Sequence, residues 1–247
     1  MTRIKHTIQI ITIMILFTGS LWAQPNGNEI LDRIDANMSA ETRYVKSKMI
    51  IHGPRSSRTV ESESWGQGES SYTEYLAPAR EKGTKMLKLE DKLWIYSPST
   101  DRTIQISGHM LRQSVMGSDL SYEDMMDDRK LSEIYDAGVV GSETIGESEC
   151  WILEMKATAD DVAYQMRKLW VDKSRYIPLK EELYAKSGKL LKRNELTNIQ
   201  QHGSRWYPGK MTFKDMLKQG SGTEFIIDEI RFNVEIPEYM LSKASLR

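Results

Sequence analysis

The residues best suited to chemistry in this sequence form one acidic run. The run comprises Asp119, Glu123, Asp124, Asp127 and Asp128. Carboxylates are ligands that Ca²⁺ accepts, but the run lacks the alternate spacing and the central glycine of a calcium-binding loop. Ser121 and Asp124 instead have the spacing of a capping box, which places negative charge at the positive end of a helix. We therefore expect a solvated helix start here and no metal site.

Other signatures of catalysis are absent from the sequence. It has no G-x-S-x-G, H-E-x-x-H, P-loop or C-x-x-C motif. His52, His109 and His202 are each remote from other ligand types at helical or hairpin spacing. The single cysteine, Cys150, lies between apolar residues, which predicts a buried strand thiol. We expect no catalytic residue, no metal and no cofactor, and hence a protein that is not an enzyme.

Residues 109–128 are also rich in methionine. The apolar members of this segment are Met110, Leu111, Val115, Met116, Leu120, Tyr122, Met125 and Met126. Methionine is flexible and suits a surface that repacks around variable apolar partners. Two interpretations stay open, an ordinary core helix and a lid over an acyl-chain cavity. The lid would comprise Met110, Leu111, Val115 and Met116, with a hinge near Gly117.

Residues 1–24 resemble an export signal. Arg3 and Lys5 precede an apolar run from Ile8 to Phe17, and Ala23 offers a cleavage site. The run is roughly 10 residues long, which is short for a helix that crosses a bilayer of about 30 Å. We expect residues 1–24 to be a signal peptide and residues 25–247 to form a single periplasmic domain; an uncleaved anchor stays open.

The charge balance argues against one class of partner. The sequence has 34 Lys and Arg against 35 Asp and Glu, with a formal net charge of −1. A general nucleic-acid binder needs a concentrated basic face, and the sequence shows none. We therefore expect no nucleic-acid partner.

Hydrophobic periodicity predicts one helix followed by many strands. Residues 28–39 place Ile30, Ile34 and Met38 on one helical face. From Tyr44 onward the period is two, with turn residues between short segments, and the pattern resumes after the methionine-rich insert. So many antiparallel strands in one twisted sheet must curl or close. The expected fold is mainly β (α+β), a curled antiparallel sheet with helices over its concave face.

Alternation also assigns the strand faces. Leu179 and Leu183 share a side opposite Lys180 and Glu182. On a later strand, one side holds Tyr207, Met211 and Phe213, and the other holds Lys210, Thr212 and Lys214. We expect a sheet with one apolar face and one wetted face. The candidate lining of an apolar cavity is therefore Leu179, Leu183, Tyr207, Met211 and Phe213.

Three motifs lie in the region that ends at Met125. Lys82-Gly83 follows Pro78, a W-x-Y-x-P strand end spans 94–98, and G-S-D-x-S-Y-E-D spans 117–124. With these motifs, the segment from Lys82 to Met125 resembles the signature region of the LolA-like outer-membrane lipoprotein-sorting proteins, in the branch associated with RND or MMPL-type exporters. The later run "LWVDKSRYIPLKEELYAKSGKLLK" is similar to a strand pair of the same proteins. The resemblance covers most of residues 25–247. The last of the three motifs is the most specific.

This resemblance implies an unclosed β-barrel of about eleven strands whose concave apolar face receives a lipid or the acyl chains of a lipoprotein. It implies no catalysis. It also implies that a structural cap shapes the lid, formed by Ser118, Asp119, Ser121, Tyr122 and Asp124. The classical carrier is shorter and lacks the acidic insert, so the identity of the cargo does not transfer.

Two functions follow as hypotheses. The first is a periplasmic carrier or binding protein and chaperone for lipids or lipoprotein acyl chains, in outer-membrane lipoprotein sorting or with an inner-membrane RND/MMPL-type exporter. Its expected partner is an inner-membrane exporter or an outer-membrane acceptor. The alternative is a periplasmic interaction module that senses lipid or envelope stress and has no carrier activity.

Overall fold

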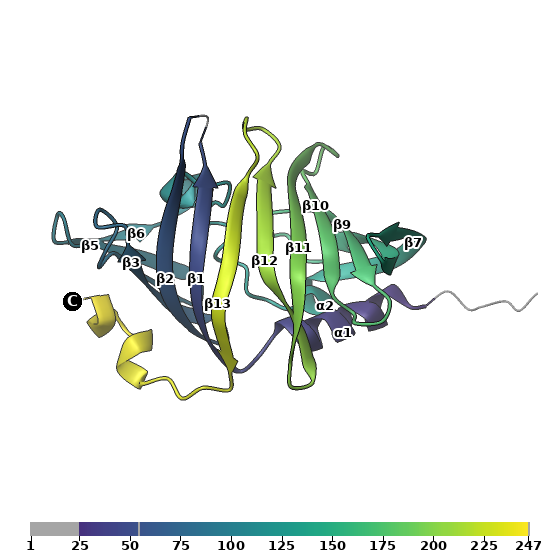
Figure 1. Ribbon diagram of the computed structural model, residues 1–247, viewed down its shortest axis with the longest axis horizontal. Coiled ribbons are helices and arrows are strands. Elements are labelled where there is room, and N and C mark those ends of the chain that lie inside the picture. Colours follow the sequence, from purple (N-terminus) through teal and green to yellow (C-terminus); the bar gives the residue numbers. More distant parts are fainter. Residues whose placement is uncertain (1–24, 54, 247) are drawn as a thin grey trace, which may run out of the picture.

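The computed structural model describes residues 25–53 and 55–246. The predicted signal peptide therefore lies outside the described residues. Within them, a single antiparallel sheet of thirteen strands dominates the molecule (Figure 1). This is the predicted mainly β fold, with two strands more than the resemblance implies.

The elements follow one another in two runs of strands. The first run is β1 (Thr42–His52), β2 (Ser57–Gln67), β3 (Ser70–Ala77), β4 (Lys85–Leu89), β5 (Lys92–Ser97) and β6 (Arg102–Ile106). The second run is β7 (Tyr135–Ile145), β8 (Ser148–Ala157), β9 (Met166–Asp172), β10 (Pro178–Tyr184), β11 (Leu190–His202), β12 (Arg205–Asp215) and β13 (Thr223–Phe232). The α-helices are α1 (Gly27–Met38) and α2 (Leu131–Ile134), and the 3-10 helices are η1 (Gly108–Arg112), η2 (Val115–Gly117), η3 (Glu238–Leu241) and η4 (Lys243–Leu246).

The two runs join where β1 pairs with β13. The strand order is β6-β5-β4-β3-β2-β1-β13-β12-β11-β10-β9-β8-β7, and β6 and β7 are its two edges. Every neighbouring pair is antiparallel, from Arg43 opposite Phe232 at the junction to Ser97 opposite Arg102 near one edge. The sheet curls but does not close, as predicted.

This topology determines the path of residues 107–134. Because β6 and β7 are opposite edges of the sheet, the chain between them has to connect the two edges, and it runs over the concave side, where Leu120 packs with Met49 and Val60. We call residues 107–134 the crossing segment. It appears in teal behind the central strands in Figure 1.

The predicted helix start in the crossing segment is wrong. Residues 118–130 contain no helix, only turns and a bridge between Ser114 and Ser121. The reciprocal bonds of the capping box do form, from Ser121 N to Asp124 Oδ2 at 2.6 Å and from Asp124 N to Ser121 Oγ at 3.2 Å. They close a turn instead of a helix. The methionines do not lie on a single core helix, but Met110 and Met116 lie in η1 and η2 and pack on apolar clusters of the sheet. The lid remains a hypothesis.

Helix α1 covers one half of the concave face, in agreement with the sequence. Ile30, Leu31 and Ile34 are buried against apolar residues of β7, β8 and β9. Gly27 permits this close approach, because a Cβ atom there would lie 2.2 Å from the carbonyl oxygen of Ala137. Asp35 accepts hydrogen bonds from the first two backbone amides of α2, so the two helices support each other.

The C-terminal residues cover part of the convex face. Leu246, in η4, packs with Tyr72, Leu87 and Trp94 of β3, β4 and β5. Lys85 Nζ donates to the Ser245 carbonyl at 2.9 Å. The convex face therefore has its own apolar cluster. The prediction of one apolar face and one wetted face is too simple for this half of the sheet.

Cys150 is fully buried in β8, as predicted. Burial raises the pKa of its thiol. Among the described residues, no helix is both long enough and apolar enough to cross a lipid bilayer.

Candidate functional site

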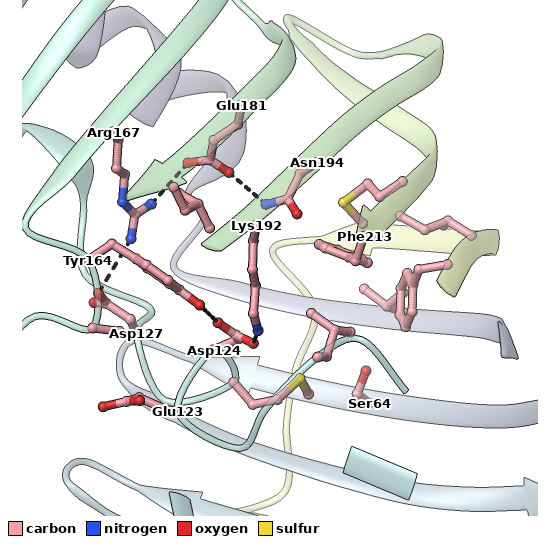
Figure 2. A pocket seen from close by; sticks show the side chains of 18 of the residues that line it. Ser64, Glu123, Asp124, Asp127, Tyr164, Arg167, Glu181, Lys192, Asn194 and Phe213 are labelled. Carbon is pink, nitrogen blue, oxygen red and sulfur yellow. Dashed lines mark hydrogen bonds and ion pairs between the residues drawn. The ribbon is translucent and has the colours of Figure 1, made fainter. Parts of the chain in front are cut away.

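The main cavity lies between the concave face of the central strands and the crossing segment. Its volume is ≈ 330 Å³. The apolar side chains on its sheet side come from β1, β10, β12 and β13: Val45, Leu183, Tyr207, Met211, Phe213, Phe225 and Ile227. Leu120 and Met125 of the crossing segment lie on the other side. Figure 2 shows this cavity with Phe213 and most of its polar side chains labelled.

A second cavity of ≈ 280 Å³ continues toward α1, where Ile34 and Met38 contribute to its lining. The two cavities share several lining residues: Arg43, Asp127, Arg167, Glu181, Asn194, Tyr207, Met211 and Phe213. The concave side therefore holds two adjoining chambers, with polar side chains where they meet.

Arg167 organises the polar boundary between the chambers. Its guanidinium lies 3.2 Å from Glu181 Oε1 and 3.8 Å from Asp127 Oδ2. Its Nε donates to the Tyr135 hydroxyl at 2.8 Å. Burial would lower the pKa of Arg167, but Glu181, Tyr135 and Asp127 outweigh it and raise that pKa. Arg167 therefore stays charged and supplies a fixed positive site inside the cavity.

A second polar group ties the crossing segment to the sheet. Lys192 of β11 forms an ion pair with Asp124, and Tyr164 donates to the other oxygen of that carboxylate at 2.5 Å (Figure 2). Burial acts to raise the pKa of Asp124, but Lys192, Ser121 and Tyr164 outweigh it and lower that pKa. Burial and Asp124 raise the pKa of Tyr164. Asp124 is therefore a carboxylate and Tyr164 a phenol near neutral pH, an arrangement suited to holding the segment and not to proton transfer.

Two acceptors at the boundary have no hydrogen-bond donor. They are Asp127 Oδ2 and Asn194 Oδ1, both buried. Asn194 donates its own amide to Glu181 Oε2 at 2.9 Å, which leaves its carbonyl oxygen unused. A buried acceptor without a donor costs about 1–3 kcal/mol. Both residues line the two chambers, but the two oxygen atoms themselves are covered by protein.

The described residues contain no group of three or more His, Cys, Asp or Glu side chains placed to hold a metal ion. The acidic run instead pairs with basic side chains. Asp128 lies 3.0 Å from Lys88 Nζ, Asp124 pairs with Lys192, and Asp127 lies 3.1 Å from Arg129 Nε. The expectation that this run is solvated is therefore wrong, because most of its carboxylates turn into the concave face.

Comparison with solved structures shows this architecture in other proteins. A domain named as an outer membrane lipoprotein-sorting protein from Vibrio parahaemolyticus is 25% identical, with a TM-score of 0.77 over 89% of this chain and 97% of that one. A DUF1329 family protein from Desulfovibrio piger is 23% identical (TM-score 0.80; 90% and 98% covered), and a LolA superfamily protein from Nitrosomonas europaea is 22% identical (TM-score 0.74; 90% and 99% covered). The comparison with curated proteins found no match.

A family model described as "Uncharacterized protein" matches residues 67–247. The chain belongs to this family, and its fold is LolA-like.

The LolA-like sheet brings four of the five predicted lining residues together. Leu183, Tyr207, Met211 and Phe213 all line the main cavity. Leu179 is absent from the lining of both chambers. The pairing of β10 with β9 shifts register between Pro178 and Lys180, so strict alternation does not extend to Leu179.

The five predicted lid residues lie beside the cavity and not among its lining residues. Met110 and Leu111 pack on an apolar cluster of β4, β5 and β6. Met116 packs on the cluster of Met49, Val60 and Tyr75, and Val115 is buried. Gly117 has a φ of +74°, a left-handed conformation that glycine adopts without strain. The residues of the crossing segment that line the cavity are Leu120, Glu123, Asp124, Met125 and Asp127.

The motif residues have different surroundings. Asp119 accepts from the Thr223 hydroxyl at 2.8 Å and from the Asp215 amide at 3.0 Å, and Ser118 is fully buried beside it. These contacts fix the crossing segment to β12 and β13. Tyr122 packs on the cluster of β4, β5 and β6. Ser121 and Asp124 form the turn described above, and Asp124 also faces the cavity.

Sequence reasoning missed the basic and amide side chains of the cavity, Arg43, Arg167, Lys192 and Asn194. Charged strand residues were assigned to the wetted face. In β11, however, Lys192 and Asn194 have the same parity as Leu196, and all three are buried. Carboxylates that are buried against a sheet require positively charged partners. The acidic composition of residues 119–128 is therefore the signal that could have identified the buried basic side chains.

Proposed function

We propose that this LolA-like protein binds the acyl chain of a lipid or a lipoprotein in the concave chambers and carries it through the periplasm. The observation that carries the proposal is the pairing of an apolar cavity floor with a polar boundary in one concave space. Leu183, Met211 and Phe213 offer the apolar surface, and Arg167 and Asn194 lie at the boundary.

The apolar floor is suited to hydrocarbon. Each buried methylene contributes about 0.8 kcal/mol, so a long chain gains on the order of 10 kcal/mol before ordering costs. A saturated chain makes no demand on hydrogen bonding, and the flexible Met125 and Met211 adapt to its path. Binding of this size is sufficient to keep an acyl chain out of water during transfer.

The boundary favours a cargo with a polar group. Asp127 Oδ2 and Asn194 Oδ1 are acceptors without donors, and a hydroxyl, amide or ammonium group on the cargo would satisfy them once the side chains turn toward the chambers. A pure hydrocarbon would leave both unsatisfied. The proposed cargo is therefore an amphiphile. Its chain would lie on the apolar floor, and its donor group would lie near Arg167 and Asn194.

Loading and release require partners in this proposal. The protein would receive its cargo from an inner-membrane exporter and deliver it to an outer-membrane acceptor. No covalent step enters it. Opening needs only a difference in affinity between states of the crossing segment.

The test is binding of a fluorescent fatty acid to two matched variants. Met211→Trp fills the cavity with a bulky side chain, whereas Thr212→Trp places the same side chain on the opposite face of β12. We expect at least a ten-fold loss of affinity in Met211→Trp and wild-type affinity in Thr212→Trp. Equal affinities in all three proteins would overturn the proposal, and the thermal melts of the variants report on folding.

A further inference from the structure

Four hairpin tips lie side by side along one end of the sheet. They are residues 53–56, 78–84, 185–189 and 216–222, which connect β1 to β2, β3 to β4, β10 to β11 and β12 to β13. The strands they connect are consecutive in the sheet order, from β4 through to β10. Three of the tips are visible at the upper end of the sheet in Figure 1. We call these four tips the rim.

The rim is basic. Its Lys and Arg residues are Arg55, Arg80, Lys82, Lys186, Lys189 and Lys218, all exposed. Its one acidic residue is Glu81, which pairs with Arg58 at 3.1 Å. Acidic residues at this end, Asp101, Asp160 and Asp161, lie in the loops toward the two edges of the sheet. The positive charge is therefore concentrated over the central strands.

Two large apolar side chains project from the middle of the rim. Leu217 is 61% exposed and Met216 is 38% exposed, and both belong to the tip between β12 and β13. Among the large exposed hydrophobic residues of the described chain, these two alone are consecutive in sequence. Exposed apolar side chains bordered by basic ones mark a site of contact with another surface.

The opposite end of the sheet carries the opposite charge. Its connections hold Glu41, Glu69, Glu90, Asp91, Glu147 and Glu235, all exposed. The basic residues within these connections, Lys173 and Arg175, pair with Glu149 and Asp172. Such a molecule has an electrostatic polarity along its strands, and an anionic plane would attract the rim and repel the other end.

We infer that the rim docks on an anionic lipid bilayer, with Met216 and Leu217 entering the headgroup layer and the basic side chains facing lipid phosphates. Lys and Arg near an anionic leaflet are attracted to it, and the attraction falls off within a Debye length. Insertion of two apolar side chains strengthens the binding of the rim to the bilayer without anchoring the protein permanently. Charge complementarity over four adjacent tips favours a lipid surface over a compact protein partner.

Docking would also affect the crossing segment. Lys218 Nζ donates to Ser114 Oγ at 2.6 Å and to the Ser118 carbonyl at 2.7 Å. A lipid phosphate competes for the same ammonium group. Contact of the rim with a membrane would therefore weaken a restraint on the segment that covers the cavity.

The experiment is co-sedimentation of the purified protein with vesicles. Vesicles of phosphatidylethanolamine and phosphatidylglycerol in equal parts are compared with vesicles of phosphatidylcholine. We expect salt-sensitive binding to the anionic vesicles only. Lys186→Gln combined with Lys189→Gln weakens it on the order of ten- to thirty-fold, and Met216→Ser combined with Leu217→Ser weakens it to a similar extent.

Matched controls keep the result specific. Tyr239→Ser removes an apolar side chain that is 63% exposed elsewhere, and Lys92→Gln removes a lysine at the acidic end. Both should bind anionic vesicles as the wild type does. The rim variants should bind the fluorescent fatty acid normally, and Met211→Trp should bind vesicles normally, so that failure of this inference is distinct from failure of the proposed function.

Three results would overturn the inference. One is equal binding to anionic and neutral vesicles, and another is equal binding by rim variants and wild type. The third is that a photo-crosslinking residue in place of Leu217 captures a protein and no lipid in membrane preparations.

Discussion

Asp124 of the crossing segment and Lys192 of β11 form an ion pair inside the concave face, where the two side chains are about nine-tenths buried (10% and 11% exposed). Tyr164 and Ser121 complete the hydrogen bonding of the carboxylate. Neither partner could be buried alone without a large desolvation cost. This pair therefore holds the cover of the cavity in place.

Removal of one partner should be costly. We expect Lys192→Met to lower the free energy of unfolding by about 3–5 kcal/mol, because it leaves the Asp124 carboxylate buried without its cation. Urea denaturation measures the change. Lys189→Met, in the exposed turn before β11, is the control and should change stability by less than about 0.5 kcal/mol. Similar values for the two variants would contradict the role given to the pair.

The same pair predicts a pH dependence. The pKa of Asp124 is lower in the folded protein than in the unfolded chain, so the unfolded chain binds its proton first as pH falls. The stability from this group is present above the unfolded carboxyl pKa of about 4 and is lost as pH falls through the folded value. Below pH about 4, the wild type should therefore lose stability more steeply than Asp124→Asn does. Parallel curves of unfolding free energy against pH would refute this.

The apolar floor predicts a face-specific effect of charge. Leu183→Asp places a carboxylate among Met211, Phe213 and Phe225, and we expect loss of fluorescent fatty acid binding because desolvation of the charge is unfavourable. Lys214→Asp places the same side chain on the opposite parity of β12 and should leave affinity within about two-fold, a change below 0.5 kcal/mol. Melting temperatures of both variants separate unfolding from loss of binding. Equal losses in the two folded variants would mean that the faces are assigned wrongly.

Bound acyl chain should change hydrogen exchange in the crossing segment more than in the strands. Leu120, Asp124 and Met125 line the cavity, whereas Met110 and Met116 do not. We therefore expect the gain in protection at residues 119–127 to exceed that at 109–117. Exchange measured with and without oleate tests this. Protection that is unchanged by a ligand shown to bind would rule out the lid.

Much of the fold follows from local sequence patterns. Period-two alternation and turn residues located most strands, and the spacing of Ile30 and Ile34 located α1. Local patterns do not determine which strands are the edges, and it is the positions of the edges that require residues 107–134 to connect one side of the sheet to the other. The capping box at Ser121 and Asp124 formed its hydrogen bonds without a helix, because the chain there has to extend across the sheet and place its carboxylates against buried cations.

The cavity was only half predictable for a related reason. Alternation placed Leu183, Met211 and Phe213 on one face, and the structure has them on the cavity floor. Alternation alone assigns a charged strand residue to the solvent-exposed face, so it does not identify Arg167 and Lys192 as cavity residues. Their burial depends on Glu181 and Asp124, partners from other elements. Leu179 fell outside the lining since a shift in register interrupts β10.

The most direct test of an acyl-chain cavity is mass spectrometry of the organic extract of protein purified without detergent. The wild type should carry an acyl lipid in roughly stoichiometric amount, and Met211→Trp, with its cavity filled, should carry at least ten-fold less at the same protein concentration. A wild-type protein free of acyl lipid, or a Met211→Trp protein that retains as much as the wild type, would contradict the account.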